Sequence, residues 1–302
     1  MLLIAVLTAE GALVMKKNVV LLGAGGKMGC RLTANLKDES DLNISYVEIS
    51  EQGRRRLKDT YGVEAVGDYG PLENADTVVF AVPDILIQNV SRSVIPLLKS
   101  GATVIGLDPA AHYGKVMQMR EDLKYFVVHP CHPPLFAFED NLSLAAQKDW
   151  FGGVGAARMD LACSIHQGSD EDYEENEDFA RRMFRPVNRC FRLTIDQMIM
   201  LEPALVESIT APLVKGMRMA VDACVEQGVP RDAVMAFVMG HLKVQFGVLF
   251  DFAGFPFSDG ANLALRNAMD VIFKPDWIEN IMSRKAVDQS VYEITHELNK
   301  EK

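Results

Sequence analysis

The stretch His129–Pro134 reads HPCHPP and is the most unusual sequence in the chain. Prolines fix their own φ, lack a backbone N–H and restrict the preceding residue, so we predict an extended, rigid loop outside any helix or strand ladder. Histidines held in such a loop can act as general acids or bases, or can bind a divalent metal ion. His129 and His132 are therefore candidate catalytic residues. The alternative is a proline-stiffened loop whose imidazoles only hydrogen-bond to the backbone.

Two more polar residues lie in apolar surroundings far along the chain. Glu202 directly precedes Pro203, and His241 lies in the segment GHLK. Leaving a buried carboxylate alone is costly, so Glu202 would have to be paired with a histidine or bound to a metal ion. We therefore predict a functional role for Glu202 and name His132 and Glu202 as candidate metal ligands. For His241 a catalytic role and a core histidine with satisfied hydrogen bonds are both open.

The segment Val19–Gly29, VVLLGAGGKMG, predicts the element that would position such chemistry. It reads as a buried strand, a glycine-rich turn and a helix, which together direct backbone N–H groups and the positive end of a helix dipole to one point. This suits a pyrophosphate, as in a variant of the dinucleotide fingerprint. Gly23 would permit the tight turn, and Gly25 or Gly26 the close approach of phosphate. Gly29 would let the helix pack on the strand.

A carboxylate follows at the distance that the fingerprint expects. The segment ISYVEI reads as a second strand, and its Glu48 lies about 20 residues past the glycines. A carboxylate there can accept both ribose hydroxyls of NAD and would repel the extra phosphate of NADP. The run Arg54–Arg56 is the opposing signal, because an arginine near this strand end can hold a 2′-phosphate. We interpret the run as a solvated helix face and predict NAD as the cofactor.

Alternating strand and helix patterns continue beyond this unit. Thr77–Val82 is a continuous apolar run, typical of a strand buried on both faces of a parallel sheet, and Thr103–Leu107 and Tyr125–Val128 read as further strands. Ligands bind beyond the carboxyl ends of such strands. We expect one crevice lined by Gly23, Glu48, Pro83, Asp108 and His129. The candidate cofactor-binding residues are Gly23, Gly25, Gly26, Lys27, Met28, Gly29, Glu48, Val82, Pro83 and Asp84.

Two strands and a helix complete the predicted first domain. Leu161–His166 and Cys190–Ile195 read as strands, and Ser169–Arg185 reads as a helix between them. Ser169 and Asp172 fit a capping box, and acids early and arginines late in this helix complement its dipole. We therefore interpret its acidic residues as a solvated helix face rather than a metal site.

Past Ile195 the strand signals disappear and apolar residues recur at helical spacing, which predicts an all-helical second domain. We expect a long helix over Met198–Gln227, another over Arg231–Phe252, and helices around 261–273 and 275–299. The helix over Arg231–Phe252 is apolar all round and is predicted to be buried. Either two such domains embrace each other in a homodimer, or the helix is buried within the monomer.

Composition limits the class of protein. The 302 residues carry a formal net charge of −10, which argues against a nucleic-acid partner. Five cysteines without CxxC spacing fit reduced thiols in a cytoplasmic protein better than a disulfide framework or a zinc module. Residues 1–14 lack the basic region of a secretion signal and are too short to span a bilayer. We predict a dispensable extension there, disordered or loosely packed, and no membrane partner.

Together the motifs resemble a known superfamily. GAGGKMG, ADTVVFAVPD, the LDPA after the next strand and the helical C-terminal half resemble the 6-phosphogluconate dehydrogenase-like, or β-hydroxyacid dehydrogenase, superfamily. HPCHPP, LEPALVES, GHLKVQFG, SDGA and Asp276-Trp277 are similar to the branch that contains D-apionate oxidoisomerase. The fold expected is α/β, with a Rossmann-type, mostly parallel sheet in residues 15–196. An all-helical substrate and dimerisation domain is expected in residues 197–302.

One departure from the superfamily pattern bears on mechanism. Members carry a catalytic lysine in a K-x-x-N arrangement early on the long helix, whereas Met198–Ser208 contains Glu202 and Glu207 and the next lysine is Lys215. Plain lysine-assisted dehydrogenation is therefore not expected. The groups left for acid/base work, directly or through a metal ion, are His129, His132, Glu202 and His241.

The resemblance to the apionate branch implies a particular reaction. NAD takes hydride from a secondary alcohol of a branched sugar acid, and the carboxylate-bearing skeleton then rearranges to a 3-oxo acid, through an intermediate that a divalent cation could chelate. We expect the nicotinamide over Pro83, a metal or proton network at His132 and Glu202, and the sugar acid between the domains. The alternatives are a simple NAD(P)-dependent hydroxyacid or sugar-acid dehydrogenase and a non-catalytic NAD(H)-sensing protein.

Overall fold

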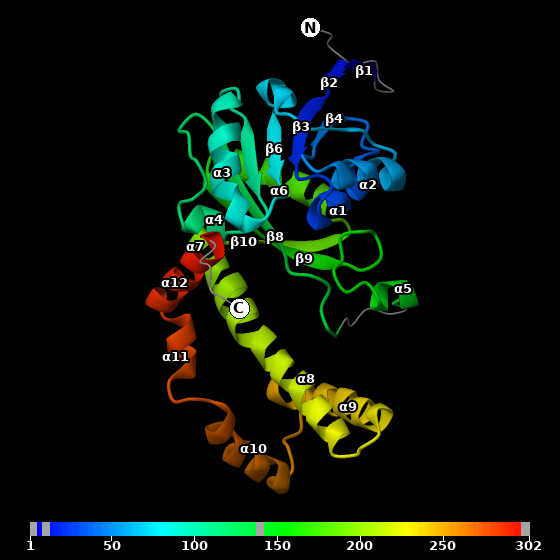
Figure 1. Cartoon of the computed structure of the whole chain (residues 1–302), viewed down its shortest axis with the longest axis vertical. Coiled ribbons are helices and arrows are strands. Elements are labelled where there is room, and N and C mark those ends of the chain that lie inside the picture. The colour runs from blue at the N-terminus through cyan, green and yellow to red at the C-terminus, as the bar shows by residue number, and fades with distance from the viewer. Residues whose placement is uncertain (1–4, 8–12, 137–141, 297–302) are drawn as a thin grey trace. The chain divides into compact units, whose positions relative to one another are not determined.

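The computed structural model describes residues 5–7, 13–136 and 142–296. The chain divides into two compact units, and the second of them is Met200–Val287 (Figure 1). The first unit contains the chain up to Ile199 and the residues from Asp288 onward, which include most of the last helix. Tyr113 donates a hydrogen bond to Asp288 within this unit. The predicted boundary between residues 196 and 197 differs from this division mainly in that returning helix.

The first unit is built on an eight-stranded sheet with the order β10-β9-β8-β7-β6-β3-β4-β5. Neighbouring strands are parallel except β8 and β9, which are antiparallel. Every residue of β6 and β7 is buried, the pattern of strands covered on both faces. The predicted α/β class is confirmed. The strands are β3 (Lys17–Leu22), β4 (Leu42–Val47), β5 (Ala65–Val66), β6 (Thr77–Phe80), β7 (Thr103–Gly106), β8 (Lys124–Pro130), β9 (Met159–Gln167) and β10 (Val187–Arg192).

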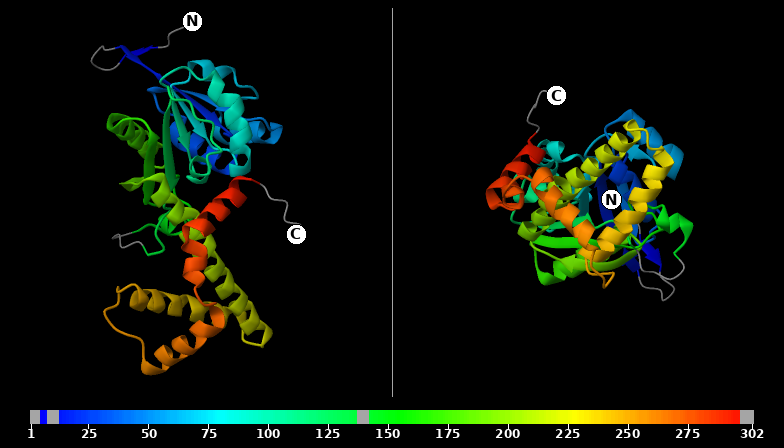
Figure 2. Two further views of the ribbon diagram at one scale, coloured as in Figure 1. Left: turned by 90° about the vertical axis from the view of Figure 1, so that its left-hand side faces the viewer. Right: turned by 90° about the horizontal axis from the view of Figure 1, so that it is seen from below.

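Helices cover both faces of this sheet, and each face has its own apolar core (Figures 1 and 2). Leu32, Leu57 and Phe179 contribute to the first core, and Ile87 and Ala111 to the second. The helices of the first face are α1 (Lys27–Leu36), α2 (Glu51–Tyr61) and α6 (Asp170–Met183). Those of the second are η1 (Gly70–Asn74), α3 (Asp84–Val94), η2 (Ile95–Leu97) and α4 (Ala110–Tyr113). The short helices α5 (Leu144–Gln147) and α7 (Ile195–Ile199) lie later in the unit.

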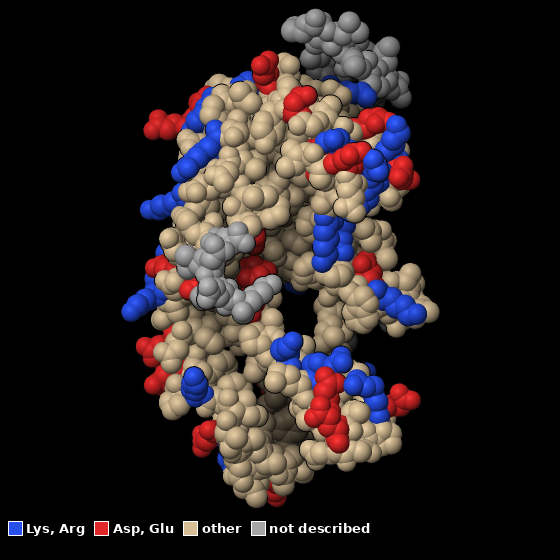
Figure 3. Space-filling view, viewed as in Figure 1, with Lys and Arg blue, Asp and Glu red and all other residues tan. Residues whose placement is uncertain are grey.

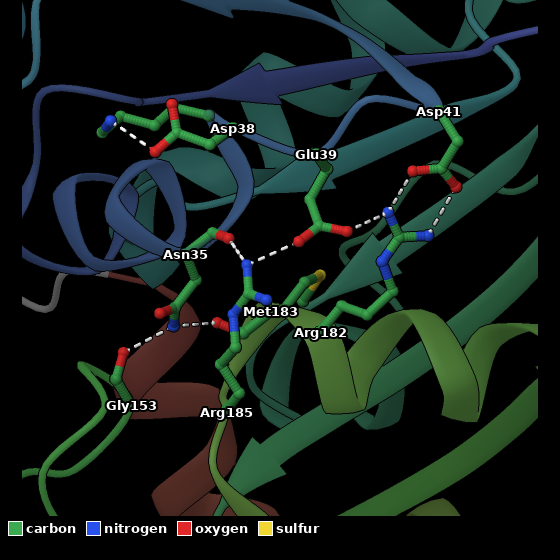
Figure 4. Close-up of polar contacts among 9 residues, drawn as sticks. Asn35, Asp38, Glu39, Asp41, Gly153, Arg182, Met183 and Arg185 are labelled. Carbon is green, nitrogen blue, oxygen red and sulfur yellow. Dashed lines mark hydrogen bonds and ion pairs between the residues drawn. The ribbon is translucent and has the colours of Figure 1, made fainter.

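Two arginines at the end of α6 join this helix to the turn between α1 and β4 (Figure 4). Arg182 binds both carboxylate oxygens of Asp41, at 2.9 and 2.7 Å, and also Glu39 at 2.5 Å. Arg185 donates to Glu39 at 2.7 Å and to the carbonyl of Asn35. The hydrogen bond from Arg182 holds the pKa of Asp41 below its ordinary value. The arginines that the sequence assigned to the helix dipole therefore also tie α6 to its neighbour.

The start of α6 is the capping box that the sequence predicts. The side-chain oxygen of Ser169 accepts the N–H of Asp172 at 3.1 Å, and the Asp172 carboxylate accepts the N–H of Ser169 at 2.8 Å. These reciprocal bonds satisfy N–H groups that an α-helix leaves unpaired at its beginning. The acids in this first turn thus have a structural role.

The second unit consists of helices among the residues that the structure describes (Figure 2). The predicted single helix over Met198–Gln227 is instead α7, a π-helical segment η3 (Met200–Thr210) and α8 (Ala211–Glu226). Pro203 lies inside η3, where its missing N–H interrupts regular α-helical bonding. The remaining helices are α9 (Arg231–Leu249), α10 (Asp259–Ile272), α11 (Trp277–Met282) and α12 (Arg284–Thr295), the last continuing into the first unit.

Three predicted element boundaries need correction. The helix expected over 275–299 is divided at Ser283, whose backbone is extended with φ −62° and ψ 147°. Residues 297–299 lie outside the described part of the chain. The strand expected at Cys190–Ile195 ends at Arg192, and Ile195 begins α7. The strand expected to end in Glu48 ends at Val47, so Glu48 lies just past it.

The prediction that the helix now labelled α9 is buried is wrong for the single chain. No residue of α9 is buried, and Phe237 and Val244 are 69% and 57% exposed. Burial within the monomer is therefore not what the structure shows. A helix that is apolar all round needs a covering surface, and its main neighbour within the unit is α8. By length and composition α9 also passes as a membrane-spanning helix, a test that core helices of soluble proteins pass as well.

The predicted extension contains a small sheet of its own. β1 (Ala5–Leu7) pairs antiparallel with β2 (Leu13–Met15), and neither strand joins the main sheet. Residues 1–4 and 8–12 lie outside the described residues. Where the structure describes the extension it shows paired strands rather than disorder, and its dispensability stays a prediction.

Surface charges of both signs are interspersed on the face of the molecule shown in Figure 3. Exposed side chains of opposite sign form ion pairs such as Arg55 with Glu51 and Lys58 with Glu64. No continuous basic stripe crosses the described residues on that face. The absence of a nucleic-acid partner, argued from net charge, stays a prediction.

Candidate functional site

The glycine-rich turn between β3 and α1 has the geometry that the sequence predicts. Gly23 has a φ of +72°, which glycine adopts without strain. A Cβ at Gly29 would clash with the carbonyl oxygen of Gly23, so the helix can pack on the strand only because residue 29 has no side chain. Gly26 is the N-cap of α1, and no side chain caps this end of the helix. The amides of Lys27, Met28 and Gly29 are thus left for an anion.

Glu48 closes this turn from the neighbouring strand end. Its side chain is buried, with one carboxylate oxygen accepting the N–H of Gly25 at 3.0 Å and the other accepting the N–H of Ser50 at 2.8 Å. Each oxygen can still accept a further hydrogen bond, as from a ribose hydroxyl. A Cβ at Gly25 would lie 2.6 Å from Cα of Gly53. Gly25 is therefore required by the packing of α2, and Gly26 is left for the approach of phosphate.

The three arginines after β4 differ in their exposure and in their partners. Arg54 donates to the two carbonyls that follow β4, at 2.9 and 2.8 Å, and Arg56 donates to the carbonyl of Gly25. Arg55 is exposed and pairs with Glu51, as the sequence interpretation holds. The interpretation is wrong for the half-buried Arg54. Arg56 is exposed, as the interpretation holds, but its guanidinium group also reaches the turn. Two of the three cations are thus engaged with backbone, which favours NAD over NADP.

A cavity of about 340 Å³ opens beside the turn. It lies at the carboxyl ends of parallel strands, where open α/β sheets bind ligands. The predicted residues Pro83, Asp108 and His129 line it, whereas Gly23 and Glu48 border the turn outside it. Predicted cofactor-binding residues that also line it are Gly26, Lys27, Met28, Val82 and Asp84.

Three residues that line this cavity, Asp84, Asp108 and His129, carry groups suited to acid/base chemistry. Burial, together with the nearby charge of Asp108, raises the pKa of Asp84 to about 6. A carboxyl group with such a pKa can give or take a proton near neutral pH. Asp108 accepts the N–H of Ala110 at 2.7 Å, and its other oxygen lies 3.7 Å from Nδ1 of His129. The sequence placed Asp108 in the crevice without a role, although it follows its strand just as Asp84 does.

His129 and Pro130 lie in β8 and pair with β9, so the prediction that prolines exclude them from a ladder is wrong. The strand β7 pairs with β8 only as far as Val127, and Cys131 donates its N–H toward β9. Since successive N–H groups point to opposite sides, Pro130 interrupts no ladder. Nδ1 of His129 lies 2.9 Å from the carbonyl of Leu107. A carbonyl only accepts, so Nδ1 carries the hydrogen and Nε2 of the neutral ring is a proton acceptor.

His132 is tied to the start of α1 through Phe151. Its Nδ1 donates to the Phe151 carbonyl at 2.8 Å, and its φ of +61° is unusual for a side-chain-bearing residue. Nζ of Lys27 and Cζ of Arg31 lie 4.0 and 4.5 Å from the centroid of the Phe151 ring, in cation–π contacts. The rings of His132 and His129 meet edge to face at 6.4 Å. Nε2 of His132 is again the proton acceptor.

Glu202 and His241 lie in the second unit. Glu202 is half-buried in the first turn of η3, so the argument from complete burial is weaker than the sequence suggested. His241 is exposed and stacks on Phe237 with ring centroids 4.1 Å apart. Its Nδ1 donates to the carbonyl of Phe237 at 2.8 Å, which leaves Nε2 as acceptor. The core-histidine alternative for His241 is wrong within the chain.

Comparison with known proteins places this geometry in a family. The model of the C-terminal domain of decarboxylating phosphogluconate dehydrogenase matches residues 139–295. A D-apionate oxidoisomerase from Cupriavidus necator is 41% identical over 281 residues, which cover 93% of this chain and 100% of that protein. The D-apionate oxidoisomerase from Rhizobium rhizogenes is 39% identical over 277 residues, covering 92% and 99%. The chain belongs to the D-apionate oxidoisomerase family. The predicted resemblance is thereby confirmed.

A crystal structure similar to the whole chain supports the fold of this family member. It is that of a semialdehyde dehydrogenase NAD-binding protein from Cupriavidus necator in complex with calcium and NAD. The two are 40% identical, with a TM-score of 0.87 over 93% of this chain and 100% of that one. The Rossmann-type fold expected from the sequence is confirmed.

Of the two residues named as metal ligands in this D-apionate oxidoisomerase family member, His132 is held in a fixed orientation. Nε2 of His132 carries a lone pair, and its ring is fixed by the bond to Phe151, the usual support of a metal-binding imidazole. Glu202 offers a carboxylate. Within the described ranges no cluster of three or more His, Cys, Asp or Glu side chains is arranged to hold a metal ion. An imidazole nitrogen and a carboxylate are donor types that divalent cations bind.

Proposed function

We propose that the protein is an NAD-dependent oxidoreductase with D-apionate oxidoisomerase activity, which oxidises a branched sugar acid and rearranges its skeleton to a 3-oxo acid. The observation that carries the proposal is the 340 Å³ cavity, where the start of α1 meets Asp84, Asp108 and His129. A hydride transfer needs a dinucleotide held beside such acid/base groups. The full-length similarity to two D-apionate oxidoisomerases supports the substrate class.

NAD would lie along the turn and into the cavity. Its pyrophosphate would accept hydrogen bonds from amides at the start of α1, and its ribose hydroxyls would donate to Glu48. The nicotinamide would lie over Pro83, and the related Cupriavidus necator structure with NAD supports this cofactor. The residues assigned to the cofactor are Gly23, Gly25, Gly26, Lys27, Met28, Gly29, Glu48, Val82, Pro83 and Asp84.

In the oxidation, Nε2 of His129 would take the proton of the substrate hydroxyl, while NAD held at the glycine-rich turn would supply the acceptor for the hydride of the alcohol carbon. The product of this step is a ketone. Nε2 is the acceptor because Nδ1–H is held by the Leu107 carbonyl. The carboxylate of Asp108, 3.7 Å from Nδ1, stabilises the imidazolium that forms. Asp84 can pass the proton to solvent, because its pKa is about 6.

The rearrangement then moves a carbon–carbon bond next to the new ketone and needs negative charge on neighbouring oxygens to be stabilised. His132 through Nε2 and Glu202 through its carboxylate would hold a divalent metal ion, with His241 as a further base. Such an ion supplies Lewis-acid polarisation of the substrate oxygens. The calcium in the related Cupriavidus necator structure supports a cation, and calcium prefers the oxygen ligands that Glu202 offers.

We also propose a homodimer formed through the second unit. An apolar groove of about 520 Å³ runs between α8 and α9 and is lined by residues such as Val221, Val234, Phe237 and His241. A second copy would cover this groove and the exposed apolar helix, in the isologous manner common to dimers. A cytoplasmic dimer accounts for the apolar length of α9 without a membrane.

A screen of sugar acids tests the proposed activity. Purified protein with NAD is offered D-apionate first, NADH absorbance is followed with and without a chelator, and products are identified by NMR. We expect NADH formation, a rearranged 3-oxo acid, and loss of turnover with chelator that added metal restores. An intact carbon skeleton would mean a simple dehydrogenase. NAD binding without turnover on any sugar acid would mean an NAD(H)-sensing protein.

A further inference from the structure

The loop that follows α5 has a backbone that is fixed from several sides. The two carboxylate oxygens of Asp149 accept the N–H groups of Gly152 and Ala157, at 2.9 and 3.2 Å. The side chain of Asn35 on α1 donates to the carbonyl of Gly153 at 2.6 Å (Figure 4). Gly152 and Gly153 are buried, with φ of +69° and +73°, which glycine adopts without strain. The loop therefore holds the residue before these glycines in a set position.

That residue is Phe151, and its main chain holds the ring of His132. Nδ1–H of His132 donates to the Phe151 carbonyl at 2.8 Å, and the two rings meet edge to face with centroids 6.1 Å apart. A Cβ at Gly152 would lie 2.9 Å from Cδ of Pro133, so the loop can pack on the segment HPCHPP only because residue 152 has no side chain. The carbonyl and the ring of Phe151 thus act on His132 separately, one on Nδ1 and the other on the ring edge.

The ring of Phe151 also contacts the beginning of α1. Nζ of Lys27 and Cζ of Arg31 lie 4.0 and 4.5 Å from its centroid. The two cations are four residues apart in one helix and repel each other, and Lys27, as the first residue of α1, also lies at the positive end of the helix dipole. The first turn of α1 contains no acid that would offset this charge. Because the face of an aromatic ring attracts cations, Phe151 holds both of them at the edge of the glycine-rich turn.

An anion at the glycine-rich turn would change this arrangement. The pyrophosphate of a dinucleotide would bring negative charge to the amides at the start of α1, where Lys27 also lines the cavity. A phosphate attracts an ammonium group more strongly than an aromatic ring does, so Nζ of Lys27 would move from the ring toward the anion. Since the backbone of the loop is fixed, the response is confined to the Phe151 ring, which is in edge-to-face contact with the His132 ring.

We propose that Phe151 is a positioning residue that couples dinucleotide binding at the glycine-rich turn to the orientation of the His132 ring. Its carbonyl keeps the hydrogen of His132 on Nδ1, and its ring transmits the position of Lys27 to the imidazole. Binding of the dinucleotide would prepare His132 for the sugar acid, so we expect the dinucleotide to bind first. The inference rests on the proposed function, because it deepens the roles given there to the NAD site and to His132.

NMR spectroscopy of the full chain with ADP-ribose tests the coupling. ADP-ribose carries the pyrophosphate of NAD but lacks the nicotinamide, so it cannot shift the His132 signals by contact with that ring. The signals are assigned as those that His132→Gln removes. We expect saturating ADP-ribose to shift them in the wild type and in Phe151→Tyr, which retains an aromatic face, but not in Phe151→Leu or Lys27→Met. Trp150→Leu, at the preceding aromatic residue, which is 74% exposed, is the matched control and should respond as the wild type does.

Kinetics and calorimetry separate this positioning role from an effect on folding. Phe151 is 43% exposed, so its substitutions are expected to retain the fold. Phe151→Leu should lower kcat about tenfold, as expected when the support of a functional histidine is lost, and should leave KM for the sugar acid near the wild-type value. Phe151→Tyr should retain the wild-type kcat.

Two results would overturn the proposal. One is that ADP-ribose binds to the wild type, as calorimetry measures, without shifting the His132 signals. The other is that Phe151→Leu shows the same shift as the wild type. If ADP-ribose does not bind at all, the NAD site fails and the coupling fails with it. If the shift follows the expected pattern but no sugar acid is turned over, the coupling is supported and only the proposed activity is refuted.

Discussion

The two units hold the same kind of side chain in opposite settings. His129 in the first unit and His241 in the second both donate Nδ1–H to a backbone carbonyl and keep Nε2 as acceptor. His129 lies in a cavity with Asp84 and Asp108, whereas His241 lies on an exposed helix beside an apolar groove. The first unit therefore assembles an acid/base site from its own residues. In the second unit, His241 and the apolar groove beside it are exposed in the single chain, so another surface has to cover them.

The difference follows from how sheets and helices gather residues. Parallel strands end at one edge of the sheet. Residues far apart in sequence that follow these strands, such as Asp84, Asp108 and His129, therefore lie close together. A pair of helices brings together only the rows of side chains along their contact, as α8 and α9 do around the groove. We infer that the chemistry of the reaction is centred on the sheet and that the helices supply assembly and one carboxylate.

The largest effects are expected at His132 and Glu202, one residue from each unit. His132→Ala and Glu202→Ala should each lower kcat by about 100- to 10,000-fold, the size of a positioned acid/base contribution, while the Kd for NAD stays near that of the wild type. Steady-state kinetics and calorimetric titration of NAD measure the two quantities. His296→Ala and Glu279→Ala are the matched controls, since neither residue borders a described cavity.

Two outcomes would break the comparison between the units. If NAD binding is lost together with turnover, His132 and Glu202 belong to the cofactor site or the core. If only His132→Ala loses activity, the first unit carries the whole reaction and the second unit serves assembly alone.

A smaller effect is expected on the dimer from Phe237→Asp. Phe237 is 69% exposed and lines the groove, and a buried aromatic anchor at an interface contributes 2 kcal/mol or more. The dissociation constant of the dimer should therefore rise by roughly 30-fold or more, as measured by sedimentation velocity over a dilution series. Val271→Asp on α10, at a residue 85% exposed and outside the groove, should leave the dimer intact. A wild-type protein that is monomeric at micromolar concentration would contradict the proposed assembly.

The smallest effect concerns pH and Asp84. Because the folded protein raises the pKa of Asp84 from 3.8 to about 6, it keeps a proton that the unfolded chain has already lost, so this residue reduces the free energy of unfolding as pH rises from 4 to 7. Allowing for partial exposure, the loss is about 1–2 kcal/mol. Asp84→Asn should remove it, so that the variant gains stability over the wild type at pH 7 but not at pH 4 in urea denaturation of the NAD-free protein.

The same experiment has a clear opposite result. A stability difference between Asp84→Asn and wild type that does not vary between pH 4 and pH 7 would show that the carboxyl group ionises normally. In that case Asp84 would not act as a proton relay, and the cavity of the first unit would have one fewer group for acid/base chemistry.

The opening strand-turn-helix could be predicted from sequence because its signals are local. The change from an apolar run to helical spacing and the glycines at Gly23 and Gly29 act within a few residues of one another. The crevice residues Pro83 and His129 followed from the shared edge of parallel strands. Asp108 remained without a role because a strand-end carboxylate acquires one only from neighbours such as Asp84.

What the sequence could not supply depends on contacts between distant segments. Pro130 joins a ladder because β9 approaches on the side where no proline N–H is needed, and β9 begins far along the chain. The apolar pattern of α9 indicates that a surface must cover it but not which molecule provides that surface. His112 lies in the plain segment AAHY, and its burial against Gly106 depends on the packing of α4 beside β7, which the local sequence does not show.

The double engagement of Glu48 has a practical consequence for protein redesign. Its two carboxylate oxygens accept the amides of Gly25 and Ser50, and in the proposed NAD complex they would also accept the ribose hydroxyls. Replacing the acid to admit NADP would thus release two amides of the loop, and the loop would loosen as the preference changed. If Glu48 binds the ribose as proposed, coenzyme selectivity and local rigidity depend on one side chain, so an engineer has to rebuild an acceptor for those amides before exchanging the nucleotide.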